Sequence, residues 1–259
     1  MSNASAPIPS TQGAILLTVF AFLIYSAISS APGLAADDAG DGKAVRDVVK
    51  KLQARYERTQ DLQADFKQST RIEGFATPIT SRGRVYIKKP GRLRWDYLDP
   101  TVEEIYVNRD EVRMYVPEHK QVLVGKLTQM AASQAPLQLL QGVAKLEEEF
   151  DLEATAEGRR GEGGVPLVTL LPKQTEPNPV RTVVRIVLEV QPKTYFIKTV
   201  SIHEISGNVS TFEFHNLKPN SGLRNALFEF ETPAGVEVVK APVLSPPERR
   251  VKSVVSLRP

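Results

Sequence analysis

The sequence predicts a mainly β fold with helices, in which a long antiparallel sheet of about eleven strands curls around an apolar cavity. Three observations predict it. Apolar and polar residues alternate with a period of two over most of the chain after residue 61, turns of Pro, Gly, Asn and Asp separate these runs, and two stretches have helical periodicity. The net charge of +3 over 259 residues gives no overall nucleic-acid signature.

The N-terminal region has the composition of an export signal. Residues 1–36 carry no Lys, Arg, Asp or Glu, and Ala14 to Ile28 form an almost unbroken apolar run. Small residues at Gly33 and Ala35 fit a cleavage site. We expect a signal peptide at 1–35, a linker at 36–42 and an exported protein. An uncleaved anchor from Ala14 to about Pro32 is the competing interpretation, since its length approaches that of a membrane span.

The folded domain is predicted at 43–239, and it begins with an amphipathic helix over Lys43–Asp61. The apolar residues of this stretch recur at the spacing of one helix face: Val45, Val48, Val49, Leu52 and Tyr56. From Leu62 the period falls to two, which predicts a half-buried strand.

A series of further strand-like runs follows. The first set lies at 82–89, 92–98, 103–108, 112–116 and 121–125. Because the connections are short, we expect antiparallel hairpins in a meander. Helical periodicity returns over Pro136–Glu149, where Leu137 and Leu140 share one apolar stripe. The sheet then resumes at 150–156, 166–172, 184–191, 196–205 and 208–217.

A sheet of this length tends to curl, and helices are present to cover an open mouth. An eleven-stranded curl is wider than side chains alone can fill, which predicts an internal cavity. A flattened sandwich with a filled core is the alternative. The chain ends in a basic, Pro-rich tail at 240–259, expected to be extended.

The hairpin with the sequence RGRVYIKKPGRLRWDY separates its cations from its apolar residues. Parity places Val85, Ile87, Leu93, Trp95 and Tyr97 on the inward face. The cations Arg82, Arg84, Arg92 and Arg94 fall on the opposite face. A single-stranded nucleic-acid platform needs cations and stacking aromatics on the same face, so this pattern argues against nucleic acid as a partner.

Lys89 is the exception, because its parity groups it with Val85 and Ile87. Two interpretations stay open. The side chain snorkels to the rim, or it forms a polar latch that binds carbonyls of a covering helix or loop and is released when ligand enters.

The sequence holds no recognisable catalytic or cofactor motif. It has no cysteine, and His119, His203 and His215 are its only histidines, far apart and without metal-ligand spacing. Nucleophile-elbow, Walker-type and dinucleotide-binding patterns are missing. We therefore expect no catalytic residue, no metal and no cofactor.

The pattern resembles the periplasmic outer-membrane lipoprotein carrier family of LolA type, from about Val45 to Val239. Three segments carry the resemblance. They are LQADFKQ at 62–68, GRVYIKKP at 83–90 running into Leu93-Arg94-Trp95, and FEFETPAGV at 228–236.

The resemblance implies a half-open antiparallel β-barrel of eleven strands, lidded by α-helices, whose apolar cavity shields lipoprotein acyl chains between the inner and outer membranes. It implies a monomer in the periplasm, an inner-membrane ABC-type release complex that supplies acylated lipoproteins, and an outer-membrane receptor. The family's latch is an arginine, and Lys89 matches it with the same charge but without the planar fork. The residues expected to line or cover the cavity are Phe66, Val85, Ile87, Leu93, Trp95, Tyr97, Leu137 and Leu140.

The outer row Arg82, Arg84, Arg92 and Arg94 is either a solvated face or a partner-docking face. Other functions also stay open. The same fold would serve a carrier or sensor of another periplasmic amphiphile. An exported enzyme or polysaccharide-binding β protein would need converging carboxylates or exposed aromatic rows, and the aromatics of the basic hairpin point inward by parity.

Overall fold

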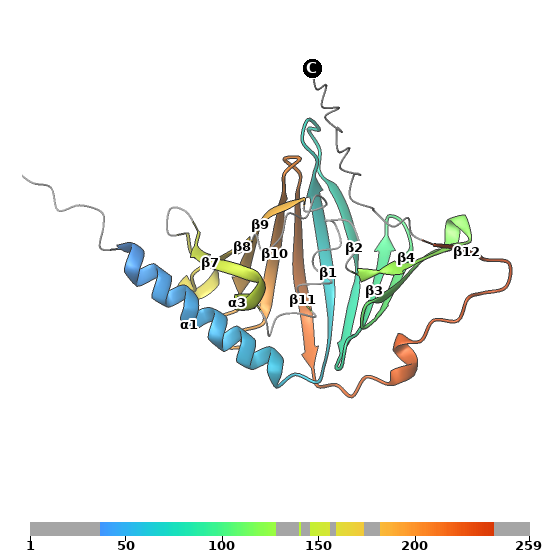
Figure 1. Ribbon diagram of the computed structural model, residues 1–259, viewed down its shortest axis with the longest axis horizontal. Coiled ribbons are helices and arrows are strands. Elements are labelled where there is room, and N and C mark those ends of the chain that lie inside the picture. Colours follow the sequence, from blue (N-terminus) through green and yellow to red (C-terminus); the bar gives the residue numbers. More distant parts are fainter. Residues whose placement is uncertain (1–36, 128–139, 141–145, 156–158, 174–181, 241–259) are drawn as a thin grey trace, which may run out of the picture. The chain divides into compact units, whose positions relative to one another are not determined.

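One open sheet of twelve strands organises the part of the chain that the structure, a computed structural model, describes (Figure 1). The described residues are 37–127, 140, 146–155, 159–173 and 182–240. The strand order is β12-β6-β5-β4-β3-β2-β1-β11-β10-β9-β8-β7. The strands run over Asp61–Arg71 (β1), Ile79–Lys88 (β2), Arg92–Asp99 (β3), Glu103–Asn108 (β4), Glu111–Val116 (β5), Gln121–Lys126 (β6), Phe150–Ala154 (β7), Val168–Pro172 (β8), Val183–Val190 (β9), Ile197–Glu204 (β10), Val209–Pro219 (β11) and Glu237–Lys240 (β12).

Two antiparallel meanders share this sheet. β1 to β6 pair in chain order, and β7 to β11 do the same. β1 joins them, because it pairs with β2 on one edge and with β11 on the other. The mainly β fold with helices is therefore confirmed, and the described sheet does not close into a barrel.

The expected count of about eleven strands was one short. β12 (Glu237–Lys240) pairs in parallel with β6, for example Val238 with Val122. The short segment EVVK carries too little alternation to mark a strand, and its partner lies more than a hundred residues away in the chain. Local periodicity cannot reveal a parallel pairing of that kind.

Helix α1 (Asp37–Glu57) lies across one face of the sheet on the side of β7 to β11, and this is the inner face (Figure 1). Val45, Val49 and Leu52 are completely buried in one cluster with apolar residues of the sheet. The helix ends four residues before the predicted Asp61. Thr59 donates its backbone N–H to the Tyr56 carbonyl and its hydroxyl to the Arg55 carbonyl. This closes the last turn, so Asp61 is free to begin β1.

The second predicted helix, Pro136–Glu149, falls mostly outside the described residues. Leu140 is described and buried, and α3 spans Leu146–Glu149. Leu146 is also buried in the core cluster. Of the described helices, none combines the length and the apolar character that crossing a membrane requires.

The chain after β11 crosses the opposite, outer face of β3 to β5. A 3-10 turn at Asn225–Phe228 follows β11, and Phe228 is buried. The Phe230 ring then packs on Tyr106 and Tyr115, with ring centroids 5.1 and 5.6 Å apart. β12 completes this return, so the outer face of the first meander is partly covered.

Gly83 in β2 permits close packing in the core. A Cβ built there would lie 2.7 Å from the Phe66 ring and 1.9 Å from the backbone oxygen of Asp96. Both distances are far below normal contact, and the neighbouring backbone cannot yield as a flexible side chain would.

We expect Gly83→Ala to lower the free energy of unfolding by about 3 kcal/mol, at the upper end of the range for overpacking. Chemical denaturation followed by circular dichroism measures this. Gly42→Ala in α1 is the matched control, because its Cβ would meet Arg46 at an ordinary 3.7 Å. That control should raise stability by about 0.5–1 kcal/mol. An unchanged midpoint for Gly83→Ala would contradict the packing described here.

Candidate functional site

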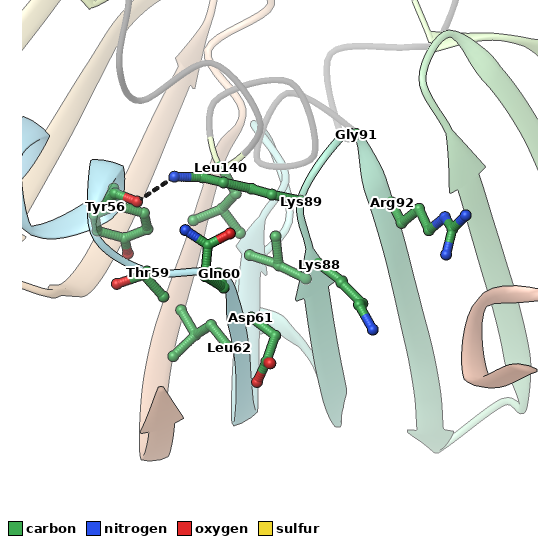
Figure 2. Close-up of a pocket in the computed structure, with 11 residues that line it drawn as sticks. Tyr56, Thr59, Gln60, Asp61, Leu62, Lys88, Lys89, Gly91, Arg92 and Leu140 are labelled. Carbon is green, nitrogen blue, oxygen red and sulfur yellow. Dashed lines mark hydrogen bonds between the residues drawn. The ribbon is translucent and has the colours of Figure 1, made fainter. Parts of the chain in front are cut away.

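A small pocket opens where the C-terminal end of α1 meets the ends of β1 to β3 (Figure 2). Its volume is about 70 Å³. The lining combines the apolar side chains of Leu62, Ile87 and Leu140 with the cations at the junction of β2 and β3. The lining residues are Tyr56, Thr59, Gln60, Asp61, Leu62, Ile87, Lys88, Lys89, Gly91, Arg92 and Leu140.

Lys89 connects the β2–β3 turn to the end of α1. Its Nζ donates to the backbone oxygens of Tyr56 at 2.6 Å and Glu57 at 3.0 Å. Figure 2 shows the side chain reaching across the pocket to Tyr56, whereas Lys88 points away. The last carbonyls of a helix lack intrahelical partners, and a cation there also interacts favourably with the helix dipole. Lys89 therefore caps α1 from a different element of the fold.

Two further residues hold the same end of α1. The Tyr56 ring packs edge-on against Phe196, with centroids 5.5 Å apart, and its hydroxyl accepts a hydrogen bond from the Ile197 backbone at 3.4 Å. Burial raises the pKa of Tyr56 well above its ordinary value, so the phenol stays neutral. The Arg55 guanidinium donates to the Thr194 carbonyl at 2.7 Å. The helix end is thus tied to the β9–β10 hairpin as well.

Asp61 fastens the start of β1 to the segment after β11. Its carboxylate accepts hydrogen bonds from the Ser221 backbone at 2.7 Å, the Ser221 hydroxyl at 3.1 Å and the Gly222 backbone at 3.1 Å. The side chain is buried, and these donors satisfy it without a cation. The sequence alone does not reveal this role of Asp61, because its donors come from a segment 160 residues further along.

The inward parity of the basic hairpin holds in the structure. Val85, Leu93 and Trp95 are fully buried in the core cluster, while Ile87 and Tyr97 are partly buried against it. Phe66 and Leu140 belong to the same cluster. Leu137 lies outside the described residues. Whether these side chains line a lipid cavity stays a prediction.

The aromatic centre of the inner face contains two residues that the sequence reasoning missed. The Trp95 ring centroid lies 4.5 Å from that of Phe66, 5.6 Å from that of Phe212 and 6.1 Å from that of Phe214. Ser210, Phe212 and Phe214 alternate along β11 with outward residues. That alternation was visible in the sequence, but only the β1–β11 pairing brings these rings to Trp95.

The four outer arginines lie in different environments. Arg82 and Arg84 are exposed, and Arg84 forms an ion pair with Asp65 at 3.3 Å. Arg92 borders the pocket. Arg94 is largely covered and contacts Asp96 at 2.8 Å. Burial raises the pKa of Asp96, although Arg94 counteracts part of the rise. Arg82 and Arg84 are therefore the more accessible candidates for docking.

Within the described ranges, no three His, Asp or Glu side chains gather closely enough to hold a metal ion. The pKa of His203 is lowered, first by burial and then by the neighbouring charges of Arg185, Arg71 and Arg159. A neutral imidazole beside cations has no obvious acid–base partner. In the part of the chain that the structure describes, the apolar inner face and its rim are therefore the best candidate for a functional site.

Comparison with known proteins gives a consistent family. A family model described as "Outer membrane lipoprotein carrier protein LolA" matches residues 57–231. The outer-membrane lipoprotein carrier protein of Methylococcus capsulatus is 31% identical over 188 residues, covering 73% of this chain and 85% of that protein. The protein of the same name from Methylobacillus flagellatus is 25% identical over 193 residues, covering 74% and 89%.

Among solved structures, that of a LolA superfamily protein from Nitrosomonas europaea aligns with 72% of this chain and 97% of its own length. The identity is 12% and the TM-score is 0.40. The sequence matches are the stronger observation, because the family model spans more than half of the chain. This protein belongs to the LolA family of outer membrane lipoprotein carrier proteins.

Proposed function

We propose that this protein carries acylated lipoproteins through the periplasm and holds their acyl chains between α1 and the inner face of the sheet. One observation carries the proposal. A continuous aromatic and aliphatic cluster joins Trp95 on the inner face of the sheet to α1, and the C-terminal carbonyls of that helix are bound by Lys89. Family membership supports lipoprotein as the cargo.

The size of the hydrophobic effect explains why such a carrier is needed. Each methylene removed from water contributes about 0.8 kcal/mol. A lipid anchor with tens of methylenes therefore corresponds to a gross stabilisation on the order of 30 kcal/mol. An anchor of that size does not cross water unshielded, and a carrier that gained all of this energy would not release it. The gross free energy of binding must therefore be offset by the free energy needed to open the carrier.

Opening the carrier costs free energy, because the contacts that hold α1 against the sheet must be broken. Lys89 binds the helix end in the empty protein, and the core packs α1 against the sheet. Entering acyl chains separate these surfaces and release the Lys89 contacts. In this mechanism Lys89 is a latch, and its hydrogen bonds stabilise the empty state alone.

The route follows from the same proposal. Residues 1–35 direct export, an inner-membrane ABC-type complex loads the carrier, and an outer-membrane receptor accepts the lipoprotein. The exposed guanidinium groups of Arg82 and Arg84 are available for docking on one of these partners.

We expect the purified protein to release an acylated lipoprotein from spheroplasts into the supernatant, and to leave a non-acylated version unaffected. Ile87→Glu places a charge on the partly buried pocket wall and should reduce release at least tenfold. Immunoblotting of the supernatant measures release.

Ile79→Glu is the matched control on the same strand. Ile79 is 54% exposed, so its substitution should leave release unchanged. If the wild type releases no lipoprotein while native mass spectrometry detects another bound amphiphile, the alternative function as a carrier or sensor of that amphiphile replaces the proposal.

We expect Lys89→Met to lower the free energy of unfolding by about 1–2 kcal/mol, because two hydrogen bonds to helix carbonyls are lost at a partly exposed site. Cargo should be retained, but its transfer to receptor-bearing membranes should slow several-fold, since the empty closed state is no longer favoured. Lys89→Arg keeps the charge and the donors, and should restore transfer. Normal transfer by Lys89→Met would remove the latch from the mechanism.

A further inference from the structure

The inner face contains one buried hydrogen-bond donor that is unused. Trp95 is 1% exposed, and its indole Nε1 has no acceptor within hydrogen-bonding geometry. Among the described residues it is the only buried side-chain nitrogen or oxygen left in this state. The protein has a single Trp, so this donor belongs to a unique side chain. Buried donors are normally paired, and an unpaired one destabilises the fold.

The surroundings explain why no acceptor is available. The rings of Phe66, Phe212 and Phe214 enclose the indole. Tyr97, two residues further along β3, has its ring centroid 6.3 Å from that of Trp95. Burial raises the pKa of Tyr97 strongly and the charge of Glu103 adds to this, while a polar interaction with the Trp95 N–H lowers it. The Tyr97 hydroxyl and the indole N–H interact at the edge of hydrogen-bonding range, but the geometry of the pair falls short of a hydrogen bond.

A polar row begins beside this donor. The Tyr97 hydroxyl donates to Gln68 Oε1 at 2.8 Å, and Gln68 Nε2 donates to Thr70 Oγ1 at 3.0 Å. Thr70 and Ser210 share a further hydrogen bond at 3.1 Å. Trp95 therefore lies at the boundary between an apolar region that reaches toward α1 and a polar strip at the other end of β1.

We propose that the Trp95 indole N–H donates a hydrogen bond to the carbonyl oxygen that links a fatty acyl chain to its head, and so positions the polar end of the lipid beside the Tyr97–Gln68 row. The inference rests on the proposed function, because it requires acyl chains on the inner face. Ester and amide linkages offer the same acceptor. A hydrocarbon chain satisfies the rings, and the carbonyl satisfies the donor.

This arrangement would give the carrier a means of selection. Apolar contacts alone distinguish poorly between lipids of equal chain length, since the hydrophobic effect is not directional. A buried donor disfavours any ligand that leaves it unpaired. The bound lipid would then be held in one orientation, with its chains toward α1.

The test compares two lipids that differ only at the linkage. Dioctanoyl phosphatidylglycerol carries ester carbonyls, and its dioctyl ether analogue does not. Both are titrated into wild-type protein below their micelle concentrations. We expect the ester lipid to bind about threefold to tenfold more tightly, the range for one hydrogen bond. The single indole N–H resonance should move downfield with the ester lipid and not with the ether lipid.

Trp95→Phe keeps an aromatic ring and removes the donor. It should bind both lipids equally, at about the affinity of wild type for the ether lipid. Tyr115→Phe removes a hydroxyl from the outer face, where the Tyr115 ring packs on Phe230, and this control should retain the ester preference. The resonance shift is measured on the unaltered protein, so the test holds even where Trp95→Phe folds poorly.

Each other outcome overturns the inference in a recognisable way. Equal binding of both lipids by wild type, with the same resonance shift, retains the proposed function and removes the role of Trp95. An indole resonance that moves upfield in lipid-free Tyr97→Phe assigns the Tyr97 hydroxyl as the acceptor. If neither lipid binds, the acyl-chain function itself is rejected.

Discussion

The pairing of β1 with β11 is the constraint on which the rest of this structure depends. Each meander is a chain of local hairpins, and β1 alone links them into one sheet. The same pairing brings Phe66 of β1 and Phe212 of β11 into one cluster with Trp95 of β3, so that the aromatic centre combines both halves of the chain. Helix α1 adds its own buried face to this cluster from the side of the second meander.

Covering the sheet with α1 creates the site. The helix end must stop where β1 begins, which leaves carbonyls without helical partners above the β2–β3 turn. Lys89 binds two of them, and the Tyr56 phenol anchors the same turn to β10. Packing, capping and the pocket are therefore consequences of one junction between helix and sheet. A ligand that enters there acts on all three together.

Much of this could be predicted from two-residue periodicity. The separation of Val85 from Arg84 in β2 follows from parity alone, and so does the exceptional position of Lys89. The partners of Lys89 could be anticipated only as helix or loop carbonyls, because the distance between β2 and α1 is set by tertiary packing. Phe212 was not connected with Trp95, since the sequence does not reveal which strands from the two meanders meet. β12 was missed for the same reason.

Lys89 and Trp95 have opposite relations to the empty protein. Lys89 has its hydrogen bonds in this structure, whereas the Trp95 N–H is unpaired. In the proposed mechanism, the Lys89 contact favours the empty carrier and the unpaired Trp95 donor disfavours it. A transfer protein needs free energies of loaded and empty states that lie close together, because a large difference in either direction would stop uptake or release. Polar groups placed at the rim and at the centre of an apolar face can adjust that difference by small amounts without altering the hydrophobic contacts that make binding possible.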